Sequence, residues 1–222
     1  MGPMRSAASL CCSAAVLTGV AALTTACAND GPDSDIARAN RSVVPIVSQR
    51  CENPNHAHGQ GVIVGRGMVI TAGHIVEGDL RSLAVDGQPA TVVALDRNTD
   101  LAIVAADLPA TEPLGFSALR PPDLVLLGPD GPQRVRVQGR ETLVIEHATD
   151  HATYRRAIIV FTPGVVEGMS GSPVVDEQGR LAGIVILEDD DTNEAIAVDA
   201  SEISALLDAA STSDTPEPTA TC

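Results

Sequence analysis

Three short segments of the sequence place a histidine, an aspartate and a serine in settings that suit catalysis. His74 follows directly after the apolar run Val69–Ala72. Asp100 directly precedes the apolar run Leu101–Val104, and Ser170 lies in a turn flanked by glycines. Each segment alone is a weak signal. The three residue types together, each at the end of an apolar run, predict nucleophilic catalysis by a serine.

The chemistry assigns a role to each of these residues. A serine hydroxyl is a poor nucleophile unless a base removes its proton as it attacks. Imidazole titrates near neutrality and can both accept and return that proton, so His74 is the expected base. Asp100 is expected to accept the other ring N–H, which fixes the tautomer and stabilises the imidazolium. Ser170 is the expected nucleophile.

Ser172 is the alternative nucleophile because it lies only two residues after Ser170. Ser170 is favoured because glycines flank it, so a sharp turn there can expose its hydroxyl. Ser172 precedes Pro173, which biases its backbone toward an extended conformation.

The elements that must position these residues are short β-strands. Apolar runs rich in β-branched residues alternate with Gly, Pro, Asp and Asn, which is typical of a sandwich or barrel. Near the C-terminus, Ser201 can cap a helix whose apolar stripe includes Ile203 and Leu207. The sequence therefore predicts an all-β fold with one short C-terminal helix. The expected strands are Val43–Val47, Gly61–Val64, Met68–Thr71, Leu83–Val85, Thr91–Leu95, Leu101–Val104, Leu124–Leu127, Arg134–Val137, Thr142–Glu146, Ala157–Phe161, Pro173–Val175, Leu181–Leu187 and Ala195–Val198.

The motifs Thr-Ala-Gly-His, Asp-Leu-Ala and Gly-Met-Ser-Gly-Ser-Pro surround His74, Asp100 and Ser170. With these motifs the chain resembles the trypsin-like (chymotrypsin-fold) serine endopeptidases from Val43 to Leu207, especially the bacterial Deg/HtrA-type and glutamyl-endopeptidase-type members. The resemblance implies two six-stranded antiparallel β-barrels and peptide-bond cleavage through an acyl-enzyme. No peptide-binding PDZ domain is expected.

The resemblance also implies an oxyanion hole formed by the backbone N–H groups of Gly168 and Ser170. Losing one such donor typically costs about 100- to 1000-fold in rate. Met169 departs from the family, which usually has Asp or Asn at this position. Methionine cannot form the ion pair with a new N-terminus that activates some members, so the sequence leaves open what holds this turn.

By resemblance, the pocket for the residue before the scissile bond has Gly164 and Val165 at its base and Ile186 and Glu188 on its wall. A preference for Arg or Lys would need a buried carboxylate at Gly164, and a preference for Glu would need a basic group in Thr162–Glu167. Neither is present in the sequence. We therefore expect cleavage after a small or medium apolar residue.

The N-terminal residues indicate export. A short basic region, an uncharged apolar stretch and small residues before Cys27 are typical of a signal peptide spanning 1–26. This cysteine resembles the lipobox cysteine of bacterial lipoproteins, which implies lipidation at Cys27 and attachment to the extracytoplasmic side of the cell membrane. Simple secretion and an uncleaved anchor are the alternatives. We expect a tether over 27–41, the protease domain over 42–210 and a flexible tail over 211–222.

Export also shapes the expectations for the other cysteines. With the signal peptide removed and Cys27 lipidated, Cys51 and Cys222 form an even pair in a compartment that permits disulfides. We predict a disulfide between them, with two free thiols as the alternative. His56 and His58 follow Cys51 in a predicted loop, but no fourth ligand lies nearby, so neither a metal nor another cofactor is expected.

Composition narrows the range of partners and functions. The 222 residues carry 14 basic side chains, all arginine, against 29 acidic ones, for a formal net charge of −15. Such a charge argues against nucleic acid as a partner. The expected partner is a protein or peptide substrate, and the expected state is a monomer. A catalytically weak or inert trypsin-like domain that acts as a binding or scaffold protein is the alternative function.

Overall fold

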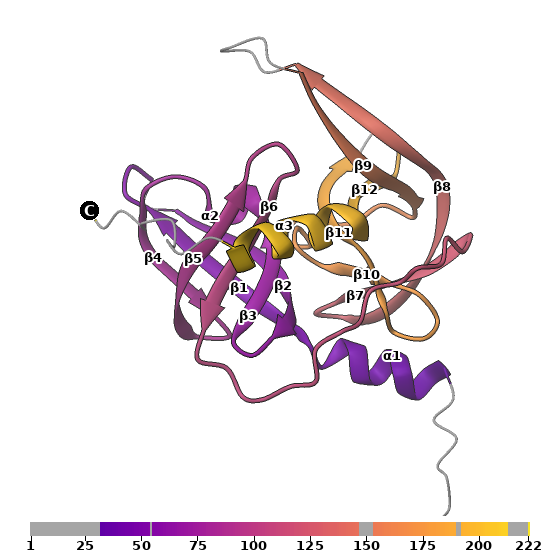
Figure 1. The fold of residues 1–222 in the computed structure, drawn as a ribbon, viewed down its shortest axis with the longest axis horizontal. Coiled ribbons are helices and arrows are strands. Elements are labelled where there is room, and N and C mark those ends of the chain that lie inside the picture. Colours follow the sequence, from indigo (N-terminus) through magenta and orange to yellow (C-terminus); the bar gives the residue numbers. More distant parts are fainter. Residues whose placement is uncertain (1–31, 54, 147–152, 190–191, 213–221) are drawn as a thin grey trace, which may run out of the picture.

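The computed structural model describes residues 32–53, 55–146, 153–189, 192–212 and 222 (Figure 1). Two six-stranded antiparallel sheets make up most of this part of the chain, and each sheet closes into a barrel. The predicted fold class is confirmed. The predicted signal peptide and Cys27 lie outside the described residues.

The first barrel has the strand order β1-β2-β3-β6-β5-β4 and closes where β1 pairs with β4. Most neighbouring strands in this barrel are consecutive in the chain and form hairpins. β3 and β6 also pair, although they are not consecutive. That pairing brings the end of β3 next to the start of β6. The strands are β1 (Val43–Arg50), β2 (His56–Gly65), β3 (Met68–Ala72), β4 (Leu80–Val85), β5 (Gln88–Asp96) and β6 (Leu101–Ala106).

The second barrel repeats this plan, with the order β10-β11-β12-β9-β8-β7 and closure between β7 and β10. β8 and β9 form a long hairpin that extends beyond the barrel (Figure 1). The strands are β7 (Asp123–Gly128), β8 (Gly131–Glu146), β9 (Thr153–Thr162), β10 (Pro173–Val175), β11 (Leu181–Asp189) and β12 (Glu194–Asp199).

The sequence predicts thirteen strands where the described part of the chain has twelve, because β8 joins two of the expected runs. Gln138-Gly139-Arg140-Glu141 separates those runs in the sequence. In the structure these residues continue the strand through a β-bulge, where the register against β9 shifts between Val137 and Gly139. A bulge accommodates one extra residue without ending the strand.

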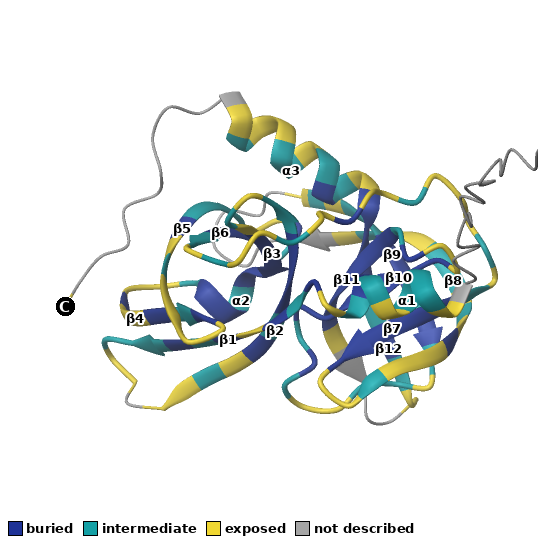
Figure 2. Cartoon of the chain, turned by 90° about the horizontal axis from the view of Figure 1, so that it is seen from below, coloured by how far each residue is buried: buried dark blue, intermediate teal, exposed yellow. Residues whose placement is uncertain are grey.

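Valine, isoleucine and leucine side chains fill both barrels, as the near absence of aromatic residues requires. Phe161 is the one aromatic among the largest fully buried side chains of the described residues. Strand β1 alternates between buried and more exposed residues, whereas β3, β6, β7 and β10 are buried along most of their length. Most of the short helix α2 (Gly73–Val76) is buried as well (Figure 2).

The helices differ from the expectations in two places. The segment 27–41, expected to be a tether, forms helix α1 (Pro32–Asn40) from Pro32 onward, with Ala39 fully buried. Helix α3 (Ala200–Thr212) is the predicted C-terminal helix. Its first turn is capped by Asp199 rather than by Ser201, because Asp199 Oδ1 accepts the backbone N–H of Ser201. No helix in the described part of the chain is long and apolar enough to cross a membrane.

Candidate active site

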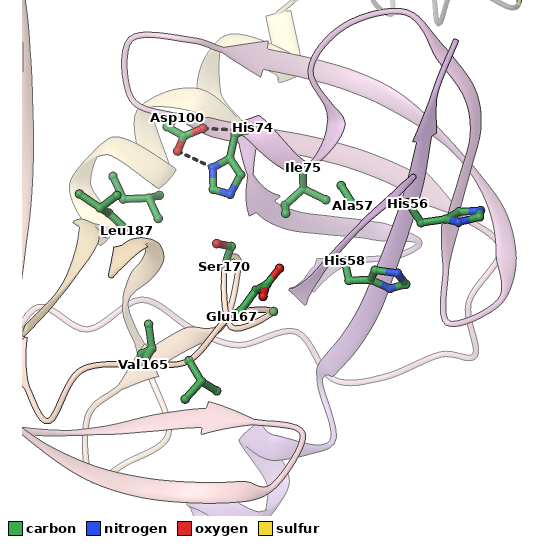
Figure 3. Close-up of a pocket in the computed structure, with 13 residues that line it drawn as sticks. His56, Ala57, His58, His74, Ile75, Asp100, Val165, Glu167, Ser170 and Leu187 are labelled. Atoms are coloured by element: carbon green, nitrogen blue, oxygen red, sulfur yellow. Dashed lines mark hydrogen bonds and ion pairs between the residues drawn. The ribbon is translucent and has the colours of Figure 1, made fainter. Parts of the chain in front are cut away.

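The fold brings His74, Asp100 and Ser170 to one cavity of about 710 Å³ (Figure 3). His74 lies in α2, directly after β3, and Asp100 directly precedes β6. These two residues are neighbours because β3 pairs with β6, with Ala72 opposite Leu101. Ser170 belongs to the turn before β10, in the other barrel.

Asp100 holds His74 by two hydrogen bonds. Its Oδ2 lies 2.8 Å from His74 Nδ1, and its Oδ1 accepts the backbone N–H of His74 at 2.7 Å. A Cβ on Gly73 would lie 3.0 Å from Asp100 Oδ1. The lack of a side chain at Gly73 therefore leaves room for the Asp100 carboxylate beside the backbone of His74. Asp100 itself has a positive φ of 57°, a conformation that Asp tolerates better than most residues. One carboxylate therefore fixes both the ring and the backbone of His74.

Ser170 lies on the far side of the imidazole from Asp100, at the tip of its turn (Figure 3). Among the described residues, Ser170 Oγ makes no hydrogen bond to His74. Catalytic hydrogen bonds are often long before substrate binds and tighten in the complex. The alternative nucleophile Ser172 is fully buried, and its Oγ contacts Met169 Sδ at 3.9 Å. Of the two serines, Ser170 lines the cavity.

The turn that precedes Ser170 leaves two backbone donors free. Gly168 has a φ of 88°, and Met169 donates its N–H to the carbonyl of Val166 at 3.1 Å. Within the described residues, no acceptor is found for the N–H of Gly168 or of Ser170. Both are therefore candidate donors to a developing oxyanion, the role that the resemblance implies for them.

Met169 provides the packing that holds this turn. Its side chain is 9% exposed and belongs to the core of the second barrel, where it lies against Gly128. Its carbonyl accepts the N–H of Ser172 at 2.9 Å. Apolar packing therefore takes the place of the ion pair that an aspartate makes here in some members of the resembled family.

The turn is also attached to the first barrel. The N–H of Gln60 on β2 donates to the carbonyl of Ser170 at 2.7 Å. Gly171 has a φ of 86°, and a Cβ there would overlap the Gln60 carbonyl and Thr71 Oγ1. Only glycine fits this contact, so it sets the position of Ser170 relative to α2.

Comparison with known proteins agrees with this geometry. Residues 59–184, more than half of the chain, match the family described as trypsin-like peptidase domain. The chain belongs to the trypsin-like peptidase family. The resemblance predicted from the three motifs is confirmed.

Relatives of this trypsin-like peptidase include serine protease Rv3671c of Mycobacterium tuberculosis (strain ATCC 25618 / H37Rv). It is 28% identical over 188 residues, which cover 78% of this chain and 47% of that protein. The chain thus spans about half the length of the curated relatives it matches. The crystal structure of the active form of the Rv3671c protease superposes with a TM-score of 0.73 and 27% identity, covering 85% of this chain and 88% of that one.

A more distant similarity supports the fold alone. The structure of the HtrA-type protease AlgW with a tripeptide has a TM-score of 0.64 and 18% identity to this trypsin-like peptidase. The match covers 80% of this chain and 62% of the AlgW chain.

Two of the four predicted pocket residues, Val165 and Ile186, line the cavity of this peptidase. Gly164 lines an adjoining hollow of about 230 Å³ together with Val165 and Met169. Glu188 lies on β11, where it pairs with Ala195. Three of the four expected pocket residues thus line two neighbouring hollows, and Glu188 is among the lining residues of neither.

The structure adds cavity residues that the sequence did not assign to a substrate pocket. Val166 and Leu187 are 68% and 52% exposed and give the cavity apolar walls. Leu187 directly follows the predicted Ile186, so the β11 motif could have identified it. The other added residues are His56, Ala57, His58, Ile75 and Glu167.

The sequence suggested that His56 and His58 lie in a loop. In the structure they lie at the start of strand β2 instead. Their rings are 6.1 Å apart, tilted by 50°. No group of three or more potential metal ligands occurs among the described residues.

Arg156 on β9 is a charged residue near the site that the motifs do not indicate. Burial lowers the pKa of its guanidinium, and the nearby carboxylates of Asp100 and Asp96 act in the opposite direction. Its Nε is buried without a hydrogen-bond acceptor. Only the packing of the two barrels brings Arg156 near these two carboxylates.

Cys51 and Cys222 are joined by a disulfide in the structure, with their Cα atoms 5.8 Å apart. Cys51 directly follows β1, and its N–H donates to the carbonyl of Asp79 at 2.8 Å. The bond ties the last residue of the chain to the first barrel.

Proposed function

We propose that this chain is a serine endopeptidase that cleaves peptide bonds through an acyl-enzyme on Ser170. The observation that carries the proposal is the pair of hydrogen bonds between His74 and Asp100, which turns the other ring nitrogen toward Ser170 (Figure 3). An aspartate that accepts the Nδ1 proton leaves Nε2 unprotonated and able to act as a base. The similarity to serine protease Rv3671c supports the same activity.

In this mechanism His74 Nε2 takes the Ser170 hydroxyl proton as Oγ attacks the scissile carbonyl carbon. The N–H groups of Gly168 and Ser170 donate to the oxyanion of the tetrahedral intermediate. The imidazolium, stabilised by Asp100, then returns the proton to the leaving amine as the C–N bond breaks. A water molecule, deprotonated by the same imidazole, hydrolyses the remaining ester and restores the Ser170 hydroxyl.

The substrate is proposed to have a small or medium apolar residue before the scissile bond. Three observations support this specificity. Val165, Ile186 and Leu187 line the cavity with aliphatic side chains. Gly164 supplies no carboxylate for a basic side chain. The acidic residue Glu167 also lines the cavity, and its negative charge disfavours an acidic substrate side chain there.

A second candidate function is an inert trypsin-like domain that binds proteins without cleaving them. The absence of a hydrogen bond between Ser170 Oγ and His74 favours it. The two unengaged N–H groups at Gly168 and Ser170 favour catalysis, because an inert domain has no need to keep donors without acceptors.

Labelling with a fluorophosphonate tests the two candidates. The purified protein is treated with the probe beside Ser170→Ala and Ser172→Ala, and the tagged peptide is mapped by mass spectrometry. We expect labelling at Ser170 that Ser170→Ala abolishes. Ser172→Ala is the matched control and should retain it. A folded parent protein that takes up no label would reject the protease and support the inert domain.

We also propose that the protein is exported and held at the membrane by lipid on Cys27. The sequence around Cys27 supports the anchor, and the Cys51–Cys222 disulfide supports an oxidising compartment. Metabolic labelling with a palmitate analogue checks the anchor. Label should enter the membrane fraction with the parent, and Cys27→Ser should remove it. Equal labelling of both proteins would place the lipid elsewhere.

A further inference from the structure

The helix that carries His74 is too short to satisfy its own backbone. α2 has four residues, Gly73–Val76, so nearly all its carbonyls lack an intrahelical N–H partner. Ala72, which precedes the helix, contributes no side-chain hydrogen bond to it. The position of α2 therefore depends on donors from other elements.

Two side chains of β1 supply these donors. Arg50 donates from Nη2 to the carbonyl of His74 at 2.6 Å and from Nε to the carbonyl of Glu77 at 2.8 Å. Ser48 is 1% exposed and donates its hydroxyl proton to the carbonyl of Ile75. Ser48 and Arg50 are two residues apart on one strand, so both side chains project from the same face of β1.

These contacts complete the restraint on His74. Asp100 holds its backbone N–H and its ring, as described above, while Arg50 holds its carbonyl. Both peptide groups of the residue are thereby fixed by charged side chains. Arginine suits this place because its planar guanidinium presents two donors at once and stays charged at every relevant pH. A lysine could reach one of the two carbonyls at a time.

We propose that Arg50 and Ser48 are positioning residues that anchor the carbonyl side of α2 to β1 and thereby set the place of the imidazole relative to Ser170. They touch neither substrate nor the reacting atoms. The inference rests on the proposed function, since the rate they affect is that of proton transfer from Ser170. A displacement of about 1 Å in a catalytic group can cost about 100-fold in rate.

The kinetic test compares Arg50→Met, Arg50→Lys and Arg81→Met. Methionine keeps the length of the side chain and removes both donors. Arg81 is the matched control, because it is exposed on β4 next to Leu80, the residue paired with Arg50. We expect Arg50→Met to lower kcat by about 10- to 100-fold with little change in KM. Arg50→Lys should give an intermediate kcat, and Arg81→Met should match the parent.

A second measurement does not depend on activity. The proton of His74 Nδ1, bonded to Asp100, is expected to give a far-downfield NMR signal, which can be assigned by its loss in Asp100→Asn. Arg50→Met and Ser48→Ala should broaden or shift this signal, while Arg50→Lys and Arg81→Met should keep it.

An unchanged signal in Arg50→Met, or a kcat equal to that of Arg81→Met, would overturn the inference. A merely stabilising role would lower the melting temperature and leave the signal in place, which also counts against it. If the parent protein takes up no fluorophosphonate, the proposed function fails and the NMR signal alone decides the positioning role.

Discussion

At the scale of single residues, the turn that carries Ser170 is expected to act through its backbone. Gly168 has a φ of 88°, and no acceptor is found among the described residues for its N–H or for that of Ser170. The buried Met169 side chain packs into the core beside this turn. In the proposed mechanism, the rate of peptide cleavage therefore depends on the backbone conformation of a residue that has no side chain.

Gly168→Ala tests this dependence. A Cβ at Gly168 meets no atom within 4 Å, so the substitution changes only the preferred backbone conformation, at a cost of about 1 kcal/mol. The turn should relax and withdraw a donor, which would lower kcat on a peptide substrate by about 100- to 1000-fold. Gly87→Ala is the control, because Gly87 also has a positive φ, 74°, and open space around it. Equal kcat values for the two variants would contradict the role of Gly168.

Asp100→Asn should leave the fold intact and lower kcat by about 10⁴-fold. Asparagine has a single acceptor oxygen, so it cannot accept both the His74 N–H and the Nδ1 proton that Asp100 accepts now. Asp86→Asn is matched to it, because Asp86 also has a positive φ, 49°, and lies away from the cavity. Steady-state kinetics with melting curves checks both variants. A loss of less than tenfold in Asp100→Asn would argue against the assigned roles.

The sequence predicted the candidate catalytic residues because each lies within a motif that local structure explains. Arg156 was not predicted for a different reason. Its electrostatic interaction with Asp100 and Asp96 depends on how the two barrels pack, and no pattern within one strand records that packing. The sequence shows that Met169 departs from the residues usual in the family at this position. Only the structure shows that its side chain is buried against Gly128.

At the scale of elements, Asp176 organises the connection between β10 and β11. Its Oδ1 accepts the N–H groups of Gln178 and Arg180, both at 3.0 Å. Its Oδ2 accepts protons from Arg180 Nε at 2.8 Å and from Ser117 Oγ at 2.6 Å. Burial alone would raise the pKa of this carboxyl, but the hydrogen bonds from Ser117, Arg180 and Gln178 outweigh burial and lower it.

This lowered pKa predicts how stability depends on pH. Because the pKa of Asp176 is lower in the folded state than the ordinary value of about 3.9, ionised Asp176 stabilises the fold above that pH. The contribution is lost as pH falls through the folded-state pKa. Asp176→Asn should reduce the free energy of unfolding at pH 7 by about 2 kcal/mol, and the difference from the parent should shrink below pH 4.

Urea unfolding at pH 7 and pH 3 measures this difference. Asp208→Asn on the exposed face of α3 is the control and should be neutral at both pH values. A deficit in Asp176→Asn that is equally large at pH 3 and pH 7 would rule out the carboxylate as its source.

Strands were easier to predict than helices for physical reasons. Alternation and turn residues mark a strand locally, so twelve strands emerged from thirteen runs, with one bulge misread as a break. Helix α1 was missed because its sequence is rich in Asp, Asn and Pro. The helix is stabilised by burial of Ala39 and Ile36 against the apolar core. The sequence of the helix alone does not indicate this burial.

At the scale of the whole molecule, the cavity depends on how the two barrels are joined. The first barrel supplies His74 and Asp100, and the second supplies Ser170. Besides the Gln60–Ser170 hydrogen bond, α3 packs on strands of both barrels, including β5 of the first and β11 of the second (Figure 1). After α3, the disulfide at Cys222 attaches the chain to the first barrel again.

The disulfide should therefore contribute to the stability of the whole fold. It closes a loop between residues 171 positions apart, and removing such a constraint from the unfolded chain typically costs about 2–4 kcal/mol. Reduction should lower the melting temperature of the parent and leave that of a Cys51→Ser/Cys222→Ser variant unchanged. Alkylation should add mass to the parent at these two cysteines only after reduction. If both thiols alkylate without a reductant, the bond is absent from the isolated protein, and the disulfide contributes nothing to its stability.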